Sequence, residues 1–224
     1  SIFAGTDDRV FRSNDNGSSW SAMYSGLPRN NVWSLAINTA GSVFAGLYGG
    51  GVYRSADNGS SWVSANTGLV ASLVFGVTTS HGKMFAAVSG GGVFRSTDGG
   101  GSWTSVVAGM SNLYAYSLAV NASGHLFVGT GDGVFRSIDD GDSWSFSGTG
   151  LTGATVRALA VNASGHLFAG TISNGIYRST DNGGSWTQVY KTSSNVDVIC
   201  LAVSPSGSVF AGTYDGALYR STNN

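Results

Sequence analysis

The acidic residues are the groups of this chain with the clearest capacity for chemistry. All twelve are Asp, and Glu is absent from the 224 residues. Two of them, Asp132 and Asp215, lie in Gly-containing segments that we expect to form turns. A pair of carboxylates is chemically sufficient for glycoside hydrolysis, with one acting as general acid and the other as base or nucleophile. Hydrolysis by this pair is therefore one hypothesis that the sequence raises.

A second group of side chains could bind a ligand without reacting with it. Aromatic rings offer faces for stacking, and nearby polar groups fix the orientation of a ligand, as carbohydrate and peptide sites require. The candidates for such a site are Trp33, Tyr48, Tyr114, Tyr116, Tyr214, Arg29, Arg157, Asp132, Asp197 and Asp215. The alternative interpretation is that they belong to variable, solvated surface loops, where charged side chains normally lie.

Charge and composition exclude several classes of protein. The net charge of -1 lacks the positive field of a nucleic-acid binder. Hydrophobic residues make up 42% of the chain and aromatic residues 12%, which is enough to build a core and argues against disorder. The lack of Glu and the presence of only two Lys do not suit helix surfaces. No apolar run approaches the roughly 18 residues of a membrane span, so an all-β protein with many tight turns remains.

The other reactive groups do not combine into a recognisable site. Cys200 stands alone, so no disulfide within the chain is expected, and its apolar run at 198–203 predicts a small buried side chain. His81, His125 and His166 fall in separate expected turns, which argues against a metal cluster or a catalytic triad. We expect no metal and no cofactor.

An internal repeat organises the whole chain. The string Ser-x-Asp-x-Gly-x-x-Trp occurs five times, and its Trp residues are 42, 41, 41 and 42 positions apart. The Asp and Trp of the five copies are Asp15 and Trp20, Asp57 and Trp62, Asp98 and Trp103, Asp139 and Trp144, and Asp181 and Trp186. A sixth copy begins at 221–223. Function is expected at positions that differ between copies, because shared positions serve the fold.

Each repeat predicts four short strands separated by tight turns. In the fourth copy the strands are 117–120, 125–129, 134–137 and a strand from 143, with aromatic and β-branched residues inside them and Gly, Asn and Asp between them. A four-stranded antiparallel unit of about 40 residues that recurs along a chain is typical of a β-propeller blade. We predict an all-β fold with a single β-propeller domain over residues 1–224.

The repeated motif is similar to that of a known family. The segment Gly-Ile-Tyr-Arg-Ser-Thr-Asp-Asn-Gly-Gly-Ser-Trp at 175–186 resembles the Asp box, or BNR repeat, of sialidases, xyloglucanase-type glycoside hydrolases and sortilin receptors. The resemblance covers essentially the whole chain and implies that the motif forms the turn between third and fourth strands. It implies an extracellular or cell-surface protein, although no signal peptide is visible. It does not select a function, since enzymes, receptors and binding modules share the motif.

The catalytic groups that the resemblance implies are only partly present. Sialidases of this family use an arginine triad, a Tyr with a Glu partner, and an Asp. This chain has no Glu, and only Arg9, Arg29 and Arg157 lie outside a repeated Arg position. The xyloglucanase-type enzymes use paired Asp residues in a cleft between two propellers, and this chain has room for one.

The polar residues that recur in every repeat are expected to be structural. The motif Asp can accept hydrogen bonds from turn amides, the Gly permits a positive φ, and the Trp is expected to pack back against its own turn. A repeated Arg is expected to cover apolar surface with its stem and to pair with turn acceptors. This position holds Arg12, Arg54, Arg95, Arg136, Arg178 and Arg220. A calcium site at 139–142 would lack the distal carboxylate of a calcium loop.

The loops from fourth to first strand and from second to third strand are expected to emerge on one face. The acids outside the motifs, Asp7, Asp8, Asp132, Asp197 and Asp215, all fall in these loops. One column at the start of the first strand varies more than its neighbours, and it holds Trp33, Val74, Tyr116, Arg157 and Ile199. We expect this column to ring the mouth of the propeller channel.

The number of blades follows from a count of strands. Second and third strands occur six times, whereas first and fourth strands occur five times. We predict six blades with three strands in each terminal blade. The alternative is five blades with merged ends, but it leaves a surplus strand pair with exposed hydrophobic edges. The same count suggests that the native polypeptide is longer, or that strands are exchanged between chains.

The function that this sequence favours is a non-catalytic binding module for a glycan or a protein on the loop face. One alternative is a glycoside hydrolase related to the xyloglucanase-type enzymes. Another is a structural repeat that associates with copies of itself through its incomplete terminal blades. No nucleic-acid partner and no membrane span are expected.

Overall fold

The computed structural model describes residues 1–70, 72–191 and 196–222 of the chain, and within these ranges it contains strands, turns and loops but no helix. Asn223, in the expected sixth motif, lies outside the described residues. No helix in the described ranges is both long and apolar enough to cross a membrane.

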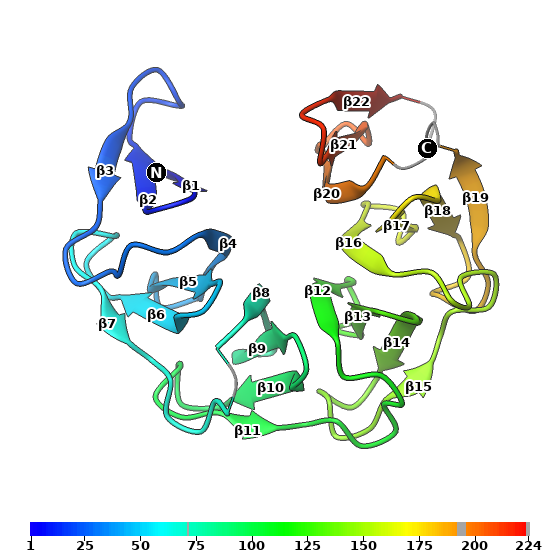
Figure 1. Cartoon of the computed structure of the whole chain (residues 1–224), viewed down its shortest axis with the longest axis horizontal. Coiled ribbons are helices and arrows are strands. Elements are labelled where there is room, and N and C mark those ends of the chain that lie inside the picture. The colour runs from blue at the N-terminus through cyan, green and yellow to red at the C-terminus, as the bar shows by residue number, and fades with distance from the viewer. Residues whose placement is uncertain (71, 192–195, 223–224) are drawn as a thin grey trace. The chain divides into compact units, whose positions relative to one another are not determined.

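The strands of the described residues form six antiparallel sheets, named here blades 1 to 6 in chain order. By its contacts the chain divides into unit 1 (Ser1–Val106), which holds blades 1 to 3, and unit 2 (Val107–Asn224), which holds blades 4 to 6. Within each unit, successive blades lie side by side (Figure 1). The prediction of one domain over residues 1–224 stays a prediction.

In unit 1, blade 1 comprises β1–β3, blade 2 comprises β4–β7 and blade 3 comprises β8–β11. Their strands are β1 (Ile2–Gly5), β2 (Val10–Ser13), β3 (Ser21–Met23), β4 (Val32–Ile37), β5 (Val43–Leu47), β6 (Gly51–Ser55), β7 (Val63–Ser64), β8 (Val74–Ser80), β9 (Lys83–Val88), β10 (Gly92–Ser96) and β11 (Thr104–Ser105).

In unit 2, blade 4 comprises β12–β15, blade 5 comprises β16–β19 and blade 6 comprises β20–β22. Their strands are β12 (Ala115–Val120), β13 (Leu126–Thr130), β14 (Gly133–Ser137), β15 (Ser145–Phe146), β16 (Val156–Val161), β17 (Leu167–Thr171), β18 (Gly175–Ser179), β19 (Thr187–Tyr190), β20 (Val198–Val203), β21 (Val209–Thr213) and β22 (Leu218–Ser221).

The predicted all-β fold with six propeller blades is confirmed. Among the described residues, blades 1 and 6 have three strands each and the four others have four. In blade 4 the observed strands begin within two residues of the predicted ones. The aromatic and β-branched residues and the turn residues of one repeat are therefore enough to predict where its strands lie.

Neighbouring blades approach one another closely at a glycine in the second strand. In unit 1, β4 contacts β8, and a Cβ built on Gly46 would lie 2.7 Å from Cγ1 of Val74. In unit 2, β12 contacts β16, and a Cβ on Gly129 would lie equally close to Cγ1 of Val156. A side chain at these glycines would push the blades apart, because the interior is already close-packed.

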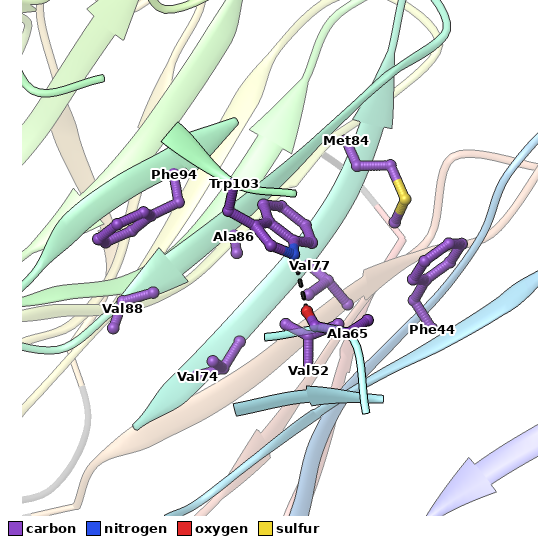
Figure 2. Packing of buried hydrophobic residues seen from close by; sticks show 10 residues of the cluster. All are labelled: Phe44, Val52, Ala65, Val74, Val77, Met84, Ala86, Val88, Phe94 and Trp103. Atoms are coloured by element: carbon purple, nitrogen blue, oxygen red, sulfur yellow. Dashed lines mark hydrogen bonds between the residues drawn. The ribbon is translucent and has the colours of Figure 1, made fainter. Parts of the chain in front are cut away.

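The motif Trp connects one blade to the preceding one. Trp103 of blade 3 is 4% exposed and lies among Phe44, Val52 and Ala65 of blade 2 (Figure 2). Its indole Nε1–H donates to the carbonyl oxygen of Ala65 at 2.8 Å, the bond drawn in Figure 2. In unit 2, the Nε1–H of Trp186 donates to the Ser147 carbonyl at 2.7 Å.

This arrangement corrects the expectation that each Trp packs back on its own turn. Trp62, Trp103, Trp144 and Trp186 are all buried, and the backbone N–H of each donates at 2.8 Å to a carbonyl in the loop after the preceding blade. Trp20 of blade 1 follows the expectation, since its Nε1–H donates to the Gly17 carbonyl of its own turn. The sequence motif is local, but the indole pocket is made by a neighbouring repeat.

The motif turns share one hydrogen-bond pattern. In the second copy the Asp57 carboxylate accepts from the hydroxyl of Ser55 at 2.7 Å and from the backbone N–H and hydroxyl of Ser61 at 2.8 and 2.6 Å. The Ser55 hydroxyl oxygen also accepts from the N–H of Gly59, whose φ is +86°. The prediction that the motif Asp holds the turn is confirmed.

These hydrogen bonds favour the ionised carboxylate and lower its pKa. The pKa values of Asp15, Asp57, Asp139 and Asp181 fall to about 2, chiefly through the hydroxyl and then the backbone N–H of the Ser four residues later. The pKa of Asp98 is lowered by the same contacts, with the Ser102 hydroxyl first.

We expect acid to destabilise the fold in a narrow pH window. The unfolded carboxyl has a pKa of about 3.9, so the stability that comes from the lowered pKa is complete above pH 5 and is lost as the pH falls from about 4 to 2. The urea midpoint, followed by Trp fluorescence, should stay level from pH 7 to 5 and then drop. The drop should be smaller in Asp57→Asn, whose amide does not ionise. A midpoint that stays level down to pH 2 would contradict the structural role of these turns.

Two of the repeated Arg residues also join neighbouring blades, whereas Arg54 donates from Nε and Nη2 to the Ser42 hydroxyl of its own blade. Nη1 of Arg12 donates to the carbonyl of Asn58 at 2.7 Å, and Nη1 of Arg136 donates to that of Asn182 at 3.1 Å. Each acceptor lies in the motif turn of the following blade. The predicted pairing with turn acceptors is therefore confirmed for these two Arg residues.

Cys200 is exposed, which corrects the expectation of a buried side chain. The equivalent residues of the other unit 2 blades, Ser117 and Ala158, are buried where the next blade covers them. Within the described residues of unit 2, no blade follows blade 6. The hydrophobic run around Cys200 predicted its strand correctly, but burial depends on a neighbour that the run does not encode.

Candidate functional site

Hydrogen bonds hold the loops with the candidate residues together at one end of the blades. In unit 1 the Tyr48 N–H donates to the Asn31 carbonyl at 3.0 Å, which joins the second-to-third-strand loop to the loop before β4. In unit 2, equivalent bonds run from Gly131 to Tyr114 at 3.1 Å and from Tyr214 to Asp197 at 3.0 Å. Within each unit, the expected gathering of these two kinds of loop is confirmed.

The loops of unit 1 carry a cluster of three aromatic rings, named here the aromatic cluster: Trp33, Tyr48 and Phe75. The ring centroids of Trp33 and Phe75 are 5.2 Å apart, those of Tyr48 and Phe75 6.0 Å, and those of Trp33 and Tyr48 6.3 Å. These separations are typical of interacting aromatic pairs. Trp33 is 41% exposed and Tyr48 49%, so the cluster offers ring surface to solvent.

A β-bulge positions Trp33 and Phe75. The pairing of β4 with β5 skips Trp33 between Val32 and Ser34, and that of β8 with β9 skips Phe75 between Val74 and Gly76. A bulge inserts one unpaired residue and re-aims its side chain. Val32 and Val74 beside it are buried. Each bulge residue is therefore fixed by a buried neighbour.

The variable column of the sequence is the bulge position, with one correction. Its member in blade 3 is Phe75 and not Val74, because Val74 is buried and paired with Val88. The column thus holds Trp33, Phe75, Tyr116, Arg157 and Ile199, each at a register shift. A signal in the sequence could have found Phe75, since each bulge residue follows a Val or Ala that begins the first strand.

In unit 2 the bulge residues Tyr116 and Arg157 lie together. The guanidinium carbon of Arg157 is 4.7 Å from the centroid of the Tyr116 ring, within the range of a cation–π interaction. Tyr114, in the loop before β12, and Tyr214, in the loop between β21 and β22, are exposed. The structure thus brings Trp33 and Tyr48 together in unit 1, and Tyr116 and Arg157 in unit 2.

The loop acids of unit 2 hold loops in place, Asp132 and Asp197 by bonds to a neighbouring loop and Asp215 within its own loop. Oδ1 of Asp132 accepts from the Gly153 N–H at 2.8 Å, and Oδ1 of Asp197 accepts from the Ser173 N–H at 3.2 Å. The Thr213 hydroxyl donates to Asp215 at 2.5 Å and lowers the pKa of that carboxyl. A general acid needs a raised pKa, so the environment of Asp215 suits an ionised turn residue better than an acid catalyst.

Arg29 lies in a separate depression of unit 1. A cavity of about 300 Å³ is lined by Arg29, Asp8, Arg9, Tyr24 and Leu27. Asp8 and Arg9 form an ion pair that lowers the pKa of the Asp8 carboxyl, first through the hydrogen bond from Arg9. The guanidinium of Arg9 is also 5.3 Å from the centroid of the Tyr24 ring. Arg29 therefore lines this depression together with Asp8 and Arg9, and it takes no part in the ring contacts of the aromatic cluster.

The three His residues lie in turns, as expected. His81 has a φ of +49° in the turn between β8 and β9. Nδ1 of His125 is 3.1 Å from the amide nitrogen of Asn182, which belongs to the next motif turn. In the part of the chain that the structure describes, no group of three His, Cys, Asp or Glu residues is arranged to hold a metal ion.

Comparisons with families agree with this fold. A family model described as the DUF6242 beta-propeller domain matches residues 2–110. Among curated proteins, none matches the chain.

Solved structures with a similar fold include sensors, enzymes and a peptide-bound protein. The extracellular domain of a putative one component system from B. thetaiotaomicron has a TM-score of 0.79 at 16% identity, over 98% of this chain and 31% of that one. The GH74 xyloglucanase from Xanthomonas campestris has a TM-score of 0.74 at 17% identity, over 98% of this chain and 42% of that one. YCF48 bound to D1 peptide has a TM-score of 0.71 at 18% identity, over 98% of this chain and 74% of that one. This chain spans about a third of the sensor domain and less than half of the xyloglucanase, and the likeness shows the fold alone.

Proposed function

We propose that this chain is a non-catalytic binding module that holds a neutral glycan on the aromatic cluster of unit 1. The observation that carries the proposal is the group of three rings, held within 5.2 to 6.3 Å of one another and partly exposed. Ring faces of this kind take up the flat C–H faces of sugars, while nearby polar groups fix the orientation of the ligand.

The surroundings of the cluster favour an uncharged ligand. The segments that carry or flank the rings, 30–33, 48–51, 72–75 and 89–91, contain no charged residue. They contain Asn, Ser and Gly, which supply amide and hydroxyl groups for hydrogen bonds to sugar hydroxyls. An acidic sugar would need a basic partner, and these segments offer none.

The cluster is also held in place before a ligand arrives. Two of its rings project from bulges whose neighbouring Val side chains are buried, and Tyr48 is held by its backbone bond to Asn31. A preorganised site loses little conformational entropy on binding. This distinguishes the cluster from rings on a solvated loop.

The proposal includes membership of the Asp-box propellers and a location outside the cell. The common hydrogen bonds of the motif turns support the first, and the likeness to an extracellular sensor domain and to a xyloglucanase supports the second and the choice of a glycan. The absence of Glu and the lowered pKa of Asp215 support binding without catalysis.

Trp33→Ala should weaken glycan binding at least about 10-fold, because a stacked ring contributes on the order of 1.4 kcal/mol or more. Binding is measured by isothermal titration calorimetry with xyloglucan oligosaccharides and a panel of soluble neutral polysaccharides. Trp20→Ala is the matched control, since Trp20 has the same 41% exposure but lies in a motif turn. The proposal fails if no neutral glycan binds, or if the two variants lose affinity equally.

A further inference from the structure

The depression of unit 1 that holds Arg29 differs in its chemistry from the aromatic cluster. We name it the arginine depression: it has a volume of about 300 Å³ and is lined by Asp8, Arg9, Tyr24, Leu27 and Arg29. These residues come from the loop between β1 and β2 and from the loop between β3 and β4. None of them belongs to the aromatic cluster, so the proposed neutral glycan leaves this depression without a role.

A hollow at the same place in blade 2 shows that the depression is a feature of the blade itself. The hollow has a volume of about 280 Å³ and is lined by uncharged residues. Three lining positions correspond in the two blades, namely Arg9 and Gly51, Tyr24 and Asn66, and Leu27 and Leu69. Blade 2 contacts a blade on either side through β4, and its hollow is still open. The two hollows therefore differ in their lining, which is charged in blade 1 and neutral in blade 2.

Backbone hydrogen bonds hold the two walls of the arginine depression together. The Val32 N–H donates to the Thr6 carbonyl at 2.8 Å, which ties the end of the β3–β4 loop to the β1–β2 loop. The Leu27 N–H donates to the Tyr24 carbonyl at 2.9 Å, and the Leu27 side chain is buried. Pro28 then fixes one backbone dihedral directly before Arg29. The loop that carries Arg29 is thus held at both ends before a ligand arrives.

Asp8 and Tyr24 set the orientation of Arg9. Nε of Arg9 donates to Oδ1 of Asp8 at 2.9 Å, and Nη2 donates to Oδ2. The guanidinium carbon lies 5.3 Å from the centroid of the Tyr24 ring. A guanidinium carries five N–H donors in a rigid fork, and in the described part of the chain Asp8 is the only side chain that accepts from them. The remaining edge of Arg9 can therefore donate to a ligand.

The charge of the lining suits a ligand with one negative charge. Arg9 and Arg29 contribute two positive charges and Asp8 one negative charge, and Asp7 does not line the depression. The pKa of the Asp8 carboxyl is lowered first by Arg9 and also by the charge of Arg29, which forms no ion pair with any described residue. Asp8 would repel the second charge of a dianion such as sulfate. A carboxylate carries one charge and matches the fork of a guanidinium.

We infer that the arginine depression binds the carboxylate of a uronic-acid sugar. Arg29 and the remaining edge of Arg9 donate to the carboxylate, while Tyr24, which is 58% exposed, and Leu27 contact the sugar ring. A volume of about 300 Å³ is at the lower end of small-molecule sites, so the depression takes about one sugar unit. This site is separate from the neutral glycan site and does not depend on it.

An NMR titration of the full chain with the methyl glycoside of glucuronic acid tests the inference. We expect saturable binding, and at least about 10-fold weaker binding of methyl glucoside, because it lacks the carboxylate that both Arg residues hold. Acetate should also bind at least about 10-fold more weakly, because it lacks the ring that contacts Tyr24 and Leu27. Equal or tighter binding of methyl glucoside, acetate, inorganic sulfate or the acidic peptide Gly-Asp-Gly would overturn the inference, as would no binding of the glucuronide.

Variants of the chain locate the site. Arg29→Gln should weaken glucuronide binding at least about 10-fold, because it removes a charge but keeps a long polar side chain. Lys83→Gln is the matched control, since it removes a positive charge of unit 1 outside the depression, and it should bind normally. Circular dichroism checks that each variant is folded. If Arg29→Gln binds normally, or if Lys83→Gln loses as much affinity, the assigned site is wrong.

A third variant separates this site from the aromatic cluster. Trp33→Ala should bind the glucuronide with unchanged affinity, because Trp33 does not line the depression. An equal loss in Trp33→Ala and Arg29→Gln would place the acidic sugar on the aromatic cluster and overturn the inference. Failure of neutral glycans to bind, with normal glucuronide binding, would contradict only the proposed function.

Discussion

Trp103→Ala should lower the free energy of unfolding by about 3–5 kcal/mol, the range for removal of a large aromatic side chain from a core. The indole of Trp103 is 4% exposed and fills the space between blades 2 and 3. Its loss leaves a cavity and also leaves the Ala65 carbonyl without the indole N–H that it accepts at 2.8 Å. A buried acceptor without a partner adds to the cost. Urea denaturation followed by circular dichroism measures the change.

Trp20→Ala is the control for this effect. It removes the same side chain from the same motif, but Trp20 is 41% exposed and its Nε1–H donates to Gly17 of its own turn. We expect a loss below about 1 kcal/mol, as for most exposed positions. Trp103→Phe should fall between the two, because it keeps a ring but removes the N–H donor. Equal losses in Trp20→Ala and Trp103→Ala would show that the motif Trp acts within its turn and not between blades.

Gly109→Ala should also be strongly destabilising, by about 2–5 kcal/mol, because strain and overpacking act together. Gly109 has a φ of +89°, and a Cβ there would lie 2.1 Å from the carbonyl oxygen of Trp144. That oxygen is backbone and cannot rotate away. The backbone of Trp144 is itself held by its N–H bond to the Ala108 carbonyl at 2.8 Å. The substitution therefore has to displace the loop at Gly109 and the backbone of Trp144 relative to each other.

Gly216→Ala separates the two causes. Gly216 has a φ of +87° and nothing within 4 Å of a Cβ, so it reports the backbone strain of a left-handed residue alone, about 1–2 kcal/mol. The difference between the two variants measures the contact with Trp144. If both variants lose the same free energy of unfolding in urea titrations, the contact between Gly109 and the Trp144 carbonyl does not contribute, and this explanation is contradicted.

Local features of the sequence were sufficient to predict the blades. The aromatic and β-branched residues and the Gly, Asn and Asp of the turns predicted β12 to β14 to within two residues at their starts. The Ser-x-Asp pattern predicted a turn in which the carboxylate accepts from nearby groups, and Asp57 does this within six residues of chain. These predictions succeeded because the interactions connect residues that are close in sequence.

The candidate site was predictable only in part. Trp33 and Tyr48 were recognised as exposed aromatic residues of the loops, and the structure brings them together. Phe75, which completes the cluster, was missed because the column was read one residue early, at Val74. A bulge shifts the pleat by one residue, so a simple alternation cannot tell which of two adjacent residues points outward.

By itself the sequence determined the repeat, the strands, the turns and the number of blades, because hydrophobic period and turn chemistry are local. Only the tertiary structure decided which surfaces a neighbouring blade covers. Cover by a neighbouring blade explains why Trp103 is buried and Trp20 exposed in the same motif. It also explains why Ala158 is buried and Cys200 exposed at the same strand position. Burial is a property of the packed neighbour, and a repeat cannot encode in its own residues whether another repeat lies against it.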